Sequence, residues 1–158
     1  MVPGFVPWRH LRRAVYPPDL YDRLRALPHF QASELTLDWE QEQKAIQTLP
    51  DEQYEEWLRF HIRREQNWFD AFHHFIVHDP CDLMAIVFDG VDKLQHLCWR
   101  FLDPGYLPTE PTPWERSVRT LCLEYFRRLD SFLERLVAAA GADAQVFLAS
   151  DHGFGPTE

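Results

Sequence analysis

The chain has 158 residues, enough for one domain with a sizeable core, and its 46% hydrophobic and 15% aromatic content favours a folded protein over a disordered one. Its formal net charge of -9 argues against nucleic acid or an anionic membrane as the main partner, because both attract clustered lysine and arginine. A phosphate ester stays compatible with this charge, since bound cations reverse the sign of the potential inside a site.

The sequence has no apolar run of membrane-spanning length, and the N-terminus lacks the basic and apolar regions of a signal peptide. Its three cysteines are odd in number and form no CxxC pair. We therefore expect no disulfide framework and a cytoplasmic location.

Residues 1–50 are interpreted as a partial insertion or cap region. Residues 1–16 open without a recognisable element, and Phe5 and Trp8 are apolar side chains that need a contact elsewhere. A short helix is predicted from Pro17 to about Leu27 and a second helical piece over 38–49, ended by Pro50. A solvated insertion is preferred here over any functional site.

A long helix is predicted over residues 51–76, with Asp51 as its N-cap and a broad apolar stripe. His73, His74 and His78 follow at its carboxyl end, and His74 and His78 have the spacing of a metal pair. We favour the simpler interpretation, because cationic side chains are stabilised at helix carboxyl ends in any case.

The second half alternates apolar runs with helices. Strands are predicted over 82–88 and 144–150, a short helix over 91–102, and a long helix over 113–140 after a proline-rich loop. Several arginines of this long helix are interpreted as a solvated face paired with acidic neighbours rather than as a phosphate site: Arg116, Arg119, Arg127 and Arg128.

This order predicts an α/β fold, a parallel sheet flanked by helices. Continuous apolar runs are typical of strands buried on both faces, and a helical crossover joins parallel neighbours. We expect the strands at 82–88 and 144–150 to be adjacent and parallel, covered by the two long helices.

Polar ligand pairs follow both predicted strands. Asp92 and His96 are four residues apart and therefore share one face of a helical turn, while Asp151 and His152 follow the second strand directly. Carboxylate and imidazole groups suit Zn²⁺ or Mn²⁺, and ligands bind beyond the carboxyl ends of parallel strands. The simpler interpretation of the second pair is a polar turn with a capping Asp.

These residues resemble known motifs. The segment Phe88-Asp-Gly-Val-Asp-Lys-Leu-Gln-His-Leu-Cys-Trp99 resembles the first metal motif of the alkaline phosphatase superfamily, in its type I phosphodiesterase/nucleotide pyrophosphatase branch. The segment Ser150-Asp-His-Gly-Phe154 is similar to the second metal motif of that family. The likeness covers residues 80–155 well and is looser upstream.

The resemblance implies phosphoryl transfer through a covalent intermediate on a Ser or Thr, with two divalent metal ions, zinc first and manganese second. Asp92 and His96 would bind one ion, and Asp151 and His152 the other. Asp89 matches no ligand position and is interpreted as a supporting group.

The resemblance also implies what the chain lacks. The nucleophile and one more Asp ligand would precede it, and another His ligand would follow it. Residues 51–158 are therefore expected to be the central part of a catalytic domain, with no catalytic nucleophile and no turnover by the isolated chain. Ser150 matches the residue before the Asp ligand, not a nucleophile.

Two other functions stay open: a non-catalytic remnant or binding domain that works with a partner, and an unrelated α/β protein with acidic turns. In the complete enzyme the expected partner is a phosphate-ester or nucleotide substrate. Uncovered sheet edges and apolar side chains such as Phe154 are expected to make the isolated chain associate.

Overall fold

The computed structural model describes residues 10–28, 30–35 and 39–155, and over these residues the chain is helical. Seven α-helices and two 3₁₀ helices follow in the order α1 (Leu11–Ala14), α2 (Leu20–Arg25), α3 (Ala32–Leu35), α4 (Trp39–Thr48), η2 (Asp51–Gln53), α5 (Tyr54–His78), α6 (Gly90–Leu102), η3 (Pro104–Tyr106) and α7 (Pro113–Ala140). Phe5 and Trp8 lie outside the described residues.

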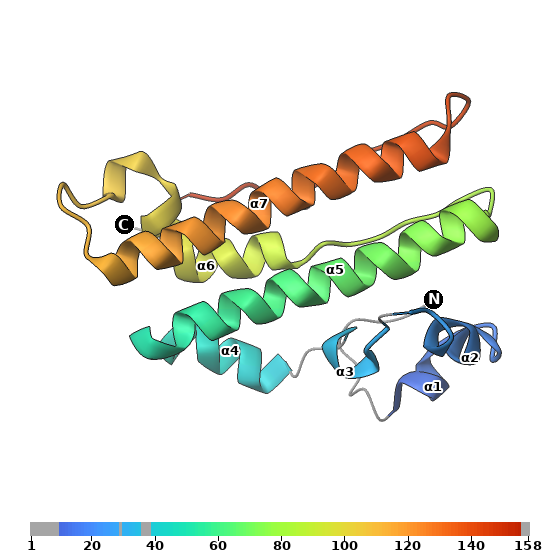
Figure 1. Ribbon diagram of the computed structural model, residues 1–158, viewed down its shortest axis with the longest axis horizontal. Coiled ribbons are helices and arrows are strands. Elements are labelled where there is room, and N and C mark those ends of the chain that lie inside the picture. The colour runs from blue at the N-terminus through green and yellow to red at the C-terminus, as the bar shows by residue number, and fades with distance from the viewer. Residues whose placement is uncertain (1–9, 29, 36–38, 156–158) are drawn as a thin grey trace.

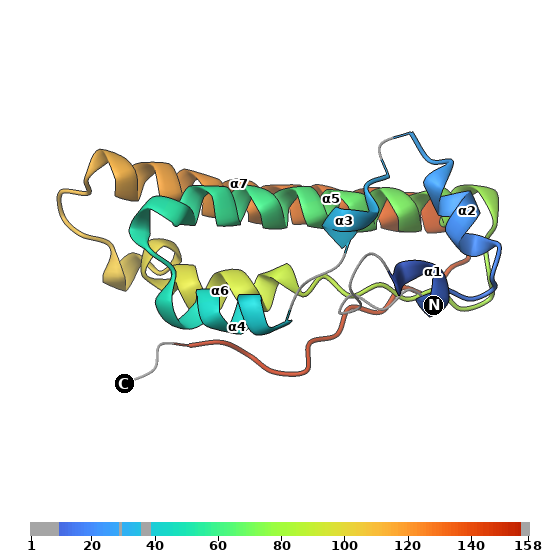
Figure 2. The same cartoon turned by 90° about the horizontal axis from the view of Figure 1, so that it is seen from below.

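The long helices α5 and α7 lie side by side and run in the same direction (Figure 1). After each of them the chain turns back as an extended segment on the same side of the helix pair (Figure 2). The first return leads into α6, and the second ends the described chain. The small helices α1, α2 and α3 gather beside the C-terminal half of α5, and α4 lies beside α6, near the N-terminal half of α5.

The apolar stripes of α5 and α7 form the centre of the core. Phe69 of α5 stacks on Phe132 of α7 with 4.4 Å between ring centroids. Near the N-terminal ends of α5 and α7, α6 packs against both helices. Its side chains Leu94 and Cys98 are fully buried there. No helix within the described ranges combines the length and the apolar character that crossing a bilayer requires.

The N-terminal helices pack on α5 through a separate apolar cluster. Leu11, Leu24 and Leu35 are buried against Ala71, and Trp68 Nε1 donates a hydrogen bond to the Leu35 carbonyl at 3.0 Å. The sequence predicted α2 but not α1 or α3. Helices of four residues are too short to show an apolar period, so packing rather than pattern defines them.

The long helices lie where the sequence predicts them, and their ends explain why. Thr112 and Glu115 form a reciprocal capping box at the start of α7, and Gly141, with φ +88°, ends the helix. The prediction of Asp51 as the N-cap of α5 is wrong. Asp51 lies in η2, and Gln53 precedes α5 without a side-chain cap.

The predicted fold class is wrong for the described residues. They contain no strand, so the parallel sheet flanked by helices is absent, and neither 82–88 nor 144–150 forms a strand. Both segments are extended and irregular. No backbone hydrogen bond in the described part of the chain joins one segment to the other.

The physical reason lies in one-sided burial. Ile86 and Phe88 pack against the α5–α7 pair, whereas Val87 between them is 78% exposed. In the second segment Phe147 and Leu148 are both largely exposed. A continuous apolar run predicts burial on two faces, but here the helices cover one face of the first segment and little of the second.

A buried carboxyl group lies where α5, α6 and α7 meet. Glu65 on α5 is 2% exposed, and its Oε1 accepts a hydrogen bond from the Gly90 amide at 2.9 Å. Burial raises the pKa of Glu65 to about 7, although the Arg64 guanidinium partly offsets this rise. The carboxyl group is therefore easier to bury protonated than ionised.

This environment predicts that stability falls as the pH rises. The folded-state pKa lies above the ordinary value of 4.5, so the stabilising contribution is complete below 4.5 and is lost as the pH rises through about 7. The shift corresponds to about 3 kcal/mol between these limits. Glu65→Gln, which cannot ionise, should therefore become more stable than the wild type at about pH 8 and lose that advantage near pH 5.

Urea unfolding across this pH range measures the difference, with the exposed Glu52→Gln as the control. A Glu65→Gln advantage that is the same at both ends of the range would contradict the assigned pKa.

Candidate metal centre

The helix α6 carries the first predicted ligand pair on an accessible face. It begins directly after the extended segment and places Asp92 in its first turn and His96 one turn later. His96 Nε2 lies 3.4 Å from Asp92 Oδ1, and both side chains are partly exposed. The two groups can therefore reach a solvent ion together.

The start of α6 is held tightly against α5 and α7. A Cβ atom at Gly90 would lie 2.5 Å from the Tyr125 hydroxyl oxygen and 2.6 Å from Glu65 Oε1. Real Cβ atoms do not come so close to other heavy atoms, so the contact requires glycine. The close packing of Gly90 therefore fixes the start of α6, and with it the first turn that carries Asp92.

The second predicted pair arrives on the return segment after α7. His152 Nε2 lies 3.8 Å from Asp92 Oδ1 and 3.7 Å from Asp151 Oδ1. Asp92 Oδ1 is therefore the common neighbour of both histidines. The structure brings all four predicted residues into one connected group.

An aromatic contact fixes this segment on α6. The Phe154 ring meets the His96 ring edge-on, with centroids 4.9 Å apart, and lies 5.5 Å from the Trp99 ring. The expectation that Phe154 is uncovered is wrong, because it is partly buried in this contact. The sequence signal for this contact is the aromatic residue directly after Asp-His-Gly, but its partner on α6 is not apparent from the sequence.

The hydrogen bonding of His152 defines which ring nitrogen can bind a cation. Nδ1 lies 2.8 Å from the Gly153 carbonyl oxygen, which can only accept, so Nδ1 carries a proton and donates. The hydrogen bond to Gly153, then Asp151 and Asp92, raise the pKa of His152 above its ordinary value. Nε2 therefore faces two carboxylates, an arrangement that favours a proton or a metal cation at this nitrogen.

The donor atoms fit a divalent ion in type and in pairwise spacing. Two ligands at about 2.1 Å from a tetrahedral zinc are roughly 3.4 Å apart, close to the separation of Asp92 and His96. Three or more His, Cys, Asp or Glu side chains do not converge on one point anywhere in the described residues. The other Asp92 oxygen, Oδ2, lies 3.3 Å from the Lys93 ammonium, which competes with a metal for this carboxylate.

The histidines at the end of α5 form a weaker arrangement. The His74 and His78 rings are 4.6 Å apart, and burial, followed by the nearby His78 and Arg23, lowers the pKa of His74. No third donor joins them within the described ranges. Nothing here favours them over the group around Asp92.

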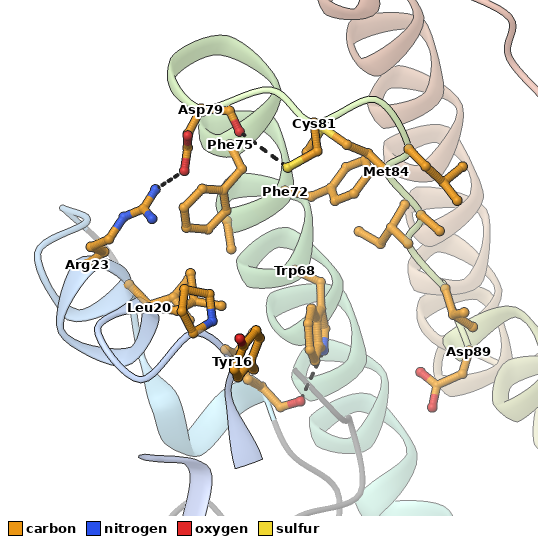
Figure 3. Close-up of a pocket in the computed structure, with 18 of the residues that line it drawn as sticks. Tyr16, Leu20, Arg23, Trp68, Phe72, Phe75, Asp79, Cys81, Met84 and Asp89 are labelled. Carbon is orange, nitrogen blue, oxygen red and sulfur yellow. Dashed lines mark hydrogen bonds and ion pairs between the residues drawn. The ribbon is translucent and has the colours of Figure 1, made fainter. Parts of the chain in front are cut away.

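A mostly apolar cavity lies away from these four residues (Figure 3). It measures about 640 Å³ and separates α2 and α5 from the extended segment 81–89. Arg23 pairs with Asp79 at one end, Asp89 lies at the other, and the walls between are mostly apolar. None of the four predicted ligands lines this cavity, so it is not the metal centre.

Two carboxylate–imidazole pairs in contact are typical of metal-dependent hydrolases. The model of the family described as type I phosphodiesterase/nucleotide pyrophosphatase matches residues 6–158. The chain therefore belongs to this family, within the alkaline phosphatase superfamily, and the resemblance found in the sequence is confirmed. The family is generally metal-dependent. Searches of curated proteins and of solved structures found no match.

The close packing at Gly90 gives a direct test of the start of α6. Gly90→Ala should lower the free energy of unfolding by about 1–3 kcal/mol, because the new methyl group must displace Tyr125 or Glu65. Urea or thermal unfolding measures this loss. Gly153→Ala is the control, because its Cβ atom would meet nothing within 4 Å. Equal stability of the two variants would show that α6 is not held as the structure has it.

Proposed function

We propose that this chain carries part of the metal centre of a phosphohydrolase of the phosphodiesterase/nucleotide pyrophosphatase type. Asp92 and His96 bind one divalent ion, and Asp151 and His152 bind the other, with zinc preferred and manganese second. The supporting observation is that two pairs far apart in the sequence meet at Asp92 Oδ1.

Each side chain contributes in a defined way. The carboxylates supply the charge that attracts the ions, and His152 presents Nε2 because its Nδ1 donates to Gly153. The bound ions would supply Lewis-acid stabilisation of the phosphoryl oxygens. The substrate is a phosphate ester or nucleotide, whose negative charge such ions would offset in a chain of net charge -9.

We further propose that this chain does not contain the catalytic nucleophile. The Ser150 hydroxyl donates to the His152 carbonyl oxygen, which fits a role in shaping the turn. The isolated chain should therefore bind metal weakly and show no turnover of a nitrophenyl phosphodiester. The odd cysteine count supports a cytoplasmic location.

Metal titration tests the four residues. Asp92→Ala and His152→Ala should each weaken Zn²⁺ or Co²⁺ binding by at least about tenfold, as the loss of a ligand or of its supporting group does. Calorimetry measures Zn²⁺ affinity, and the visible absorption of Co²⁺ reports coordination.

His78→Ala is the matched control, because it removes an imidazole from the other histidine group and should leave affinity unchanged. If Asp92→Ala and His152→Ala both bind like the wild type, the assignment of the four residues is wrong.

A second candidate function is association with a partner through the extended segments. Leu83 is 87% exposed and Phe147 86% exposed, on segments that make no strand within the described residues. Exposed apolar side chains on extended backbone are typical of surfaces that pair with another chain. The second copy of this chain is the simplest occupant.

Light scattering tests this second candidate. The wild type should form dimers or larger species as its concentration rises, and the double variant Leu83→Lys/Phe147→Lys should shift the population towards monomer. The variant Gln47→Lys/Gln53→Lys adds the same charge at exposed polar positions and should behave as the wild type. A wild-type chain that stays a compact monomer at high concentration would contradict this function.

A further inference from the structure

The N-terminus of α6 lacks a cap from its own segment. The preceding residue, Asp89, makes no side-chain hydrogen bond to the first-turn amides. Its carboxylate instead forms an ion pair with the Arg64 guanidinium of α5. A helix start often uses the side chain just before it to satisfy these amides, and at α6 another element supplies an acceptor for the first of them.

That element is α5, through Glu65. The Glu65 carboxyl group accepts from the Gly90 amide at 2.9 Å, and Arg64 Nη1 lies 3.8 Å from the same oxygen. Two consecutive residues of α5 thus hold two consecutive residues at the start of α6. Both interactions are buried, because Arg64 and Glu65 are each only 2% exposed.

Apolar packing alone does not explain this arrangement. Glu65 Oε2 is buried and makes no hydrogen bond of normal geometry within the described residues, and the buried Tyr125 hydroxyl lies against the same carboxyl group. Burying polar groups without full hydrogen bonding lowers the stability of the folded state. An apolar side chain in the same place would avoid this loss of stability. The hydrogen bond that the carboxyl group accepts from the Gly90 amide indicates a use beyond filling space.

The position of Gly90 determines the position of Asp92. The two residues lie in the same first turn of α6, and His96 follows one turn later on the same face. A shift or rotation of the helix start would change the position of Asp92 relative to His152, which lies 3.8 Å away on the separate segment after α7. The start of α6 therefore sets the distance between the Asp92–His96 pair and His152.

We propose that Glu65 is a positioning residue for the metal centre, acting from α5 through its hydrogen bond to the Gly90 amide. This inference rests on the proposed metal-binding role of Asp92 and His96. Arg64 supports it by holding Asp89, so that the chain enters α6 in one orientation.

The test compares Glu65→Leu, Glu65→Gln and Glu42→Leu in the full chain. Gln keeps a neutral acceptor for the Gly90 amide, whereas Leu removes it. Glu42 is the matched control, because it is also a buried glutamate and its hydrogen bond is to His61 of α5. Comparison with Glu42→Leu separates loss of position from general loss of stability.

Two readouts are measured: Co²⁺ affinity, and amide hydrogen exchange of residues 90–96 in the metal-free chain. Glu65→Leu should weaken Co²⁺ binding about 10- to 100-fold and raise exchange at the start of α6 by at least about tenfold. Glu65→Gln should stay within about threefold of the wild type on both readouts, because the hydrogen bond is kept. Glu42→Leu should leave the exchange of residues 90–96 and the Co²⁺ affinity near wild-type values.

The inference is overturned if Glu65→Leu and Glu42→Leu give the same exchange and affinity, or if Glu65→Gln is as impaired as Glu65→Leu. If Glu65→Leu does not fold, Gly90→Ala disturbs the same contact and should give the same two effects. Failure of the proposed function has a different signature. The wild type and Asp92→Ala would then bind Co²⁺ equally, while hydrogen exchange would still show whether Glu65 holds α6.

Discussion

The packing of α5 against α7 is the interaction on which the described structure depends. The stacked rings of Phe69 and Phe132 join the C-terminal halves of the two helices, and α6 joins their N-terminal halves through Leu94 and Cys98. The N-terminal helices pack on α5, and the first extended segment packs on both long helices. Apolar area removed from water is the dominant stabilising term here, because most of the buried side chains are aliphatic or aromatic.

The candidate metal centre is a consequence of the direction in which the chain leaves this helix pair. Because α5 and α7 run in the same direction, both return segments travel back along the same side (Figure 2). The first return delivers α6 with Asp92 and His96, and the second delivers Asp151 and His152. Phe154 then joins the second return to α6, so an apolar contact supports a polar site.

The candidate site brings two carboxylates close to one ammonium group and two imidazole rings. Asp92 has the Lys93 ammonium beside one oxygen and two imidazole nitrogens near the other. Without a metal, a proton on His152 offsets the carboxylates, which agrees with its raised pKa. With a metal, the ion takes that role, so protons and metal compete for the same nitrogen.

The sequence by itself determined the main helices and predicted the four residues of the candidate site. Apolar spacing together with Pro113 and Gly141 was enough for α7, because these residues act on the backbone locally. The spacing of Asp92 and His96 likewise determined that they share a face of α6. Only the tertiary structure decided the rest. A strand needs hydrogen bonds from a neighbour, so the apolar run 82–88 could not show by itself that one of its faces stays exposed. The meeting of His152 with Asp92, and of Glu65 with Gly90, joins elements far apart in the chain, and local pattern carries no information on such distances.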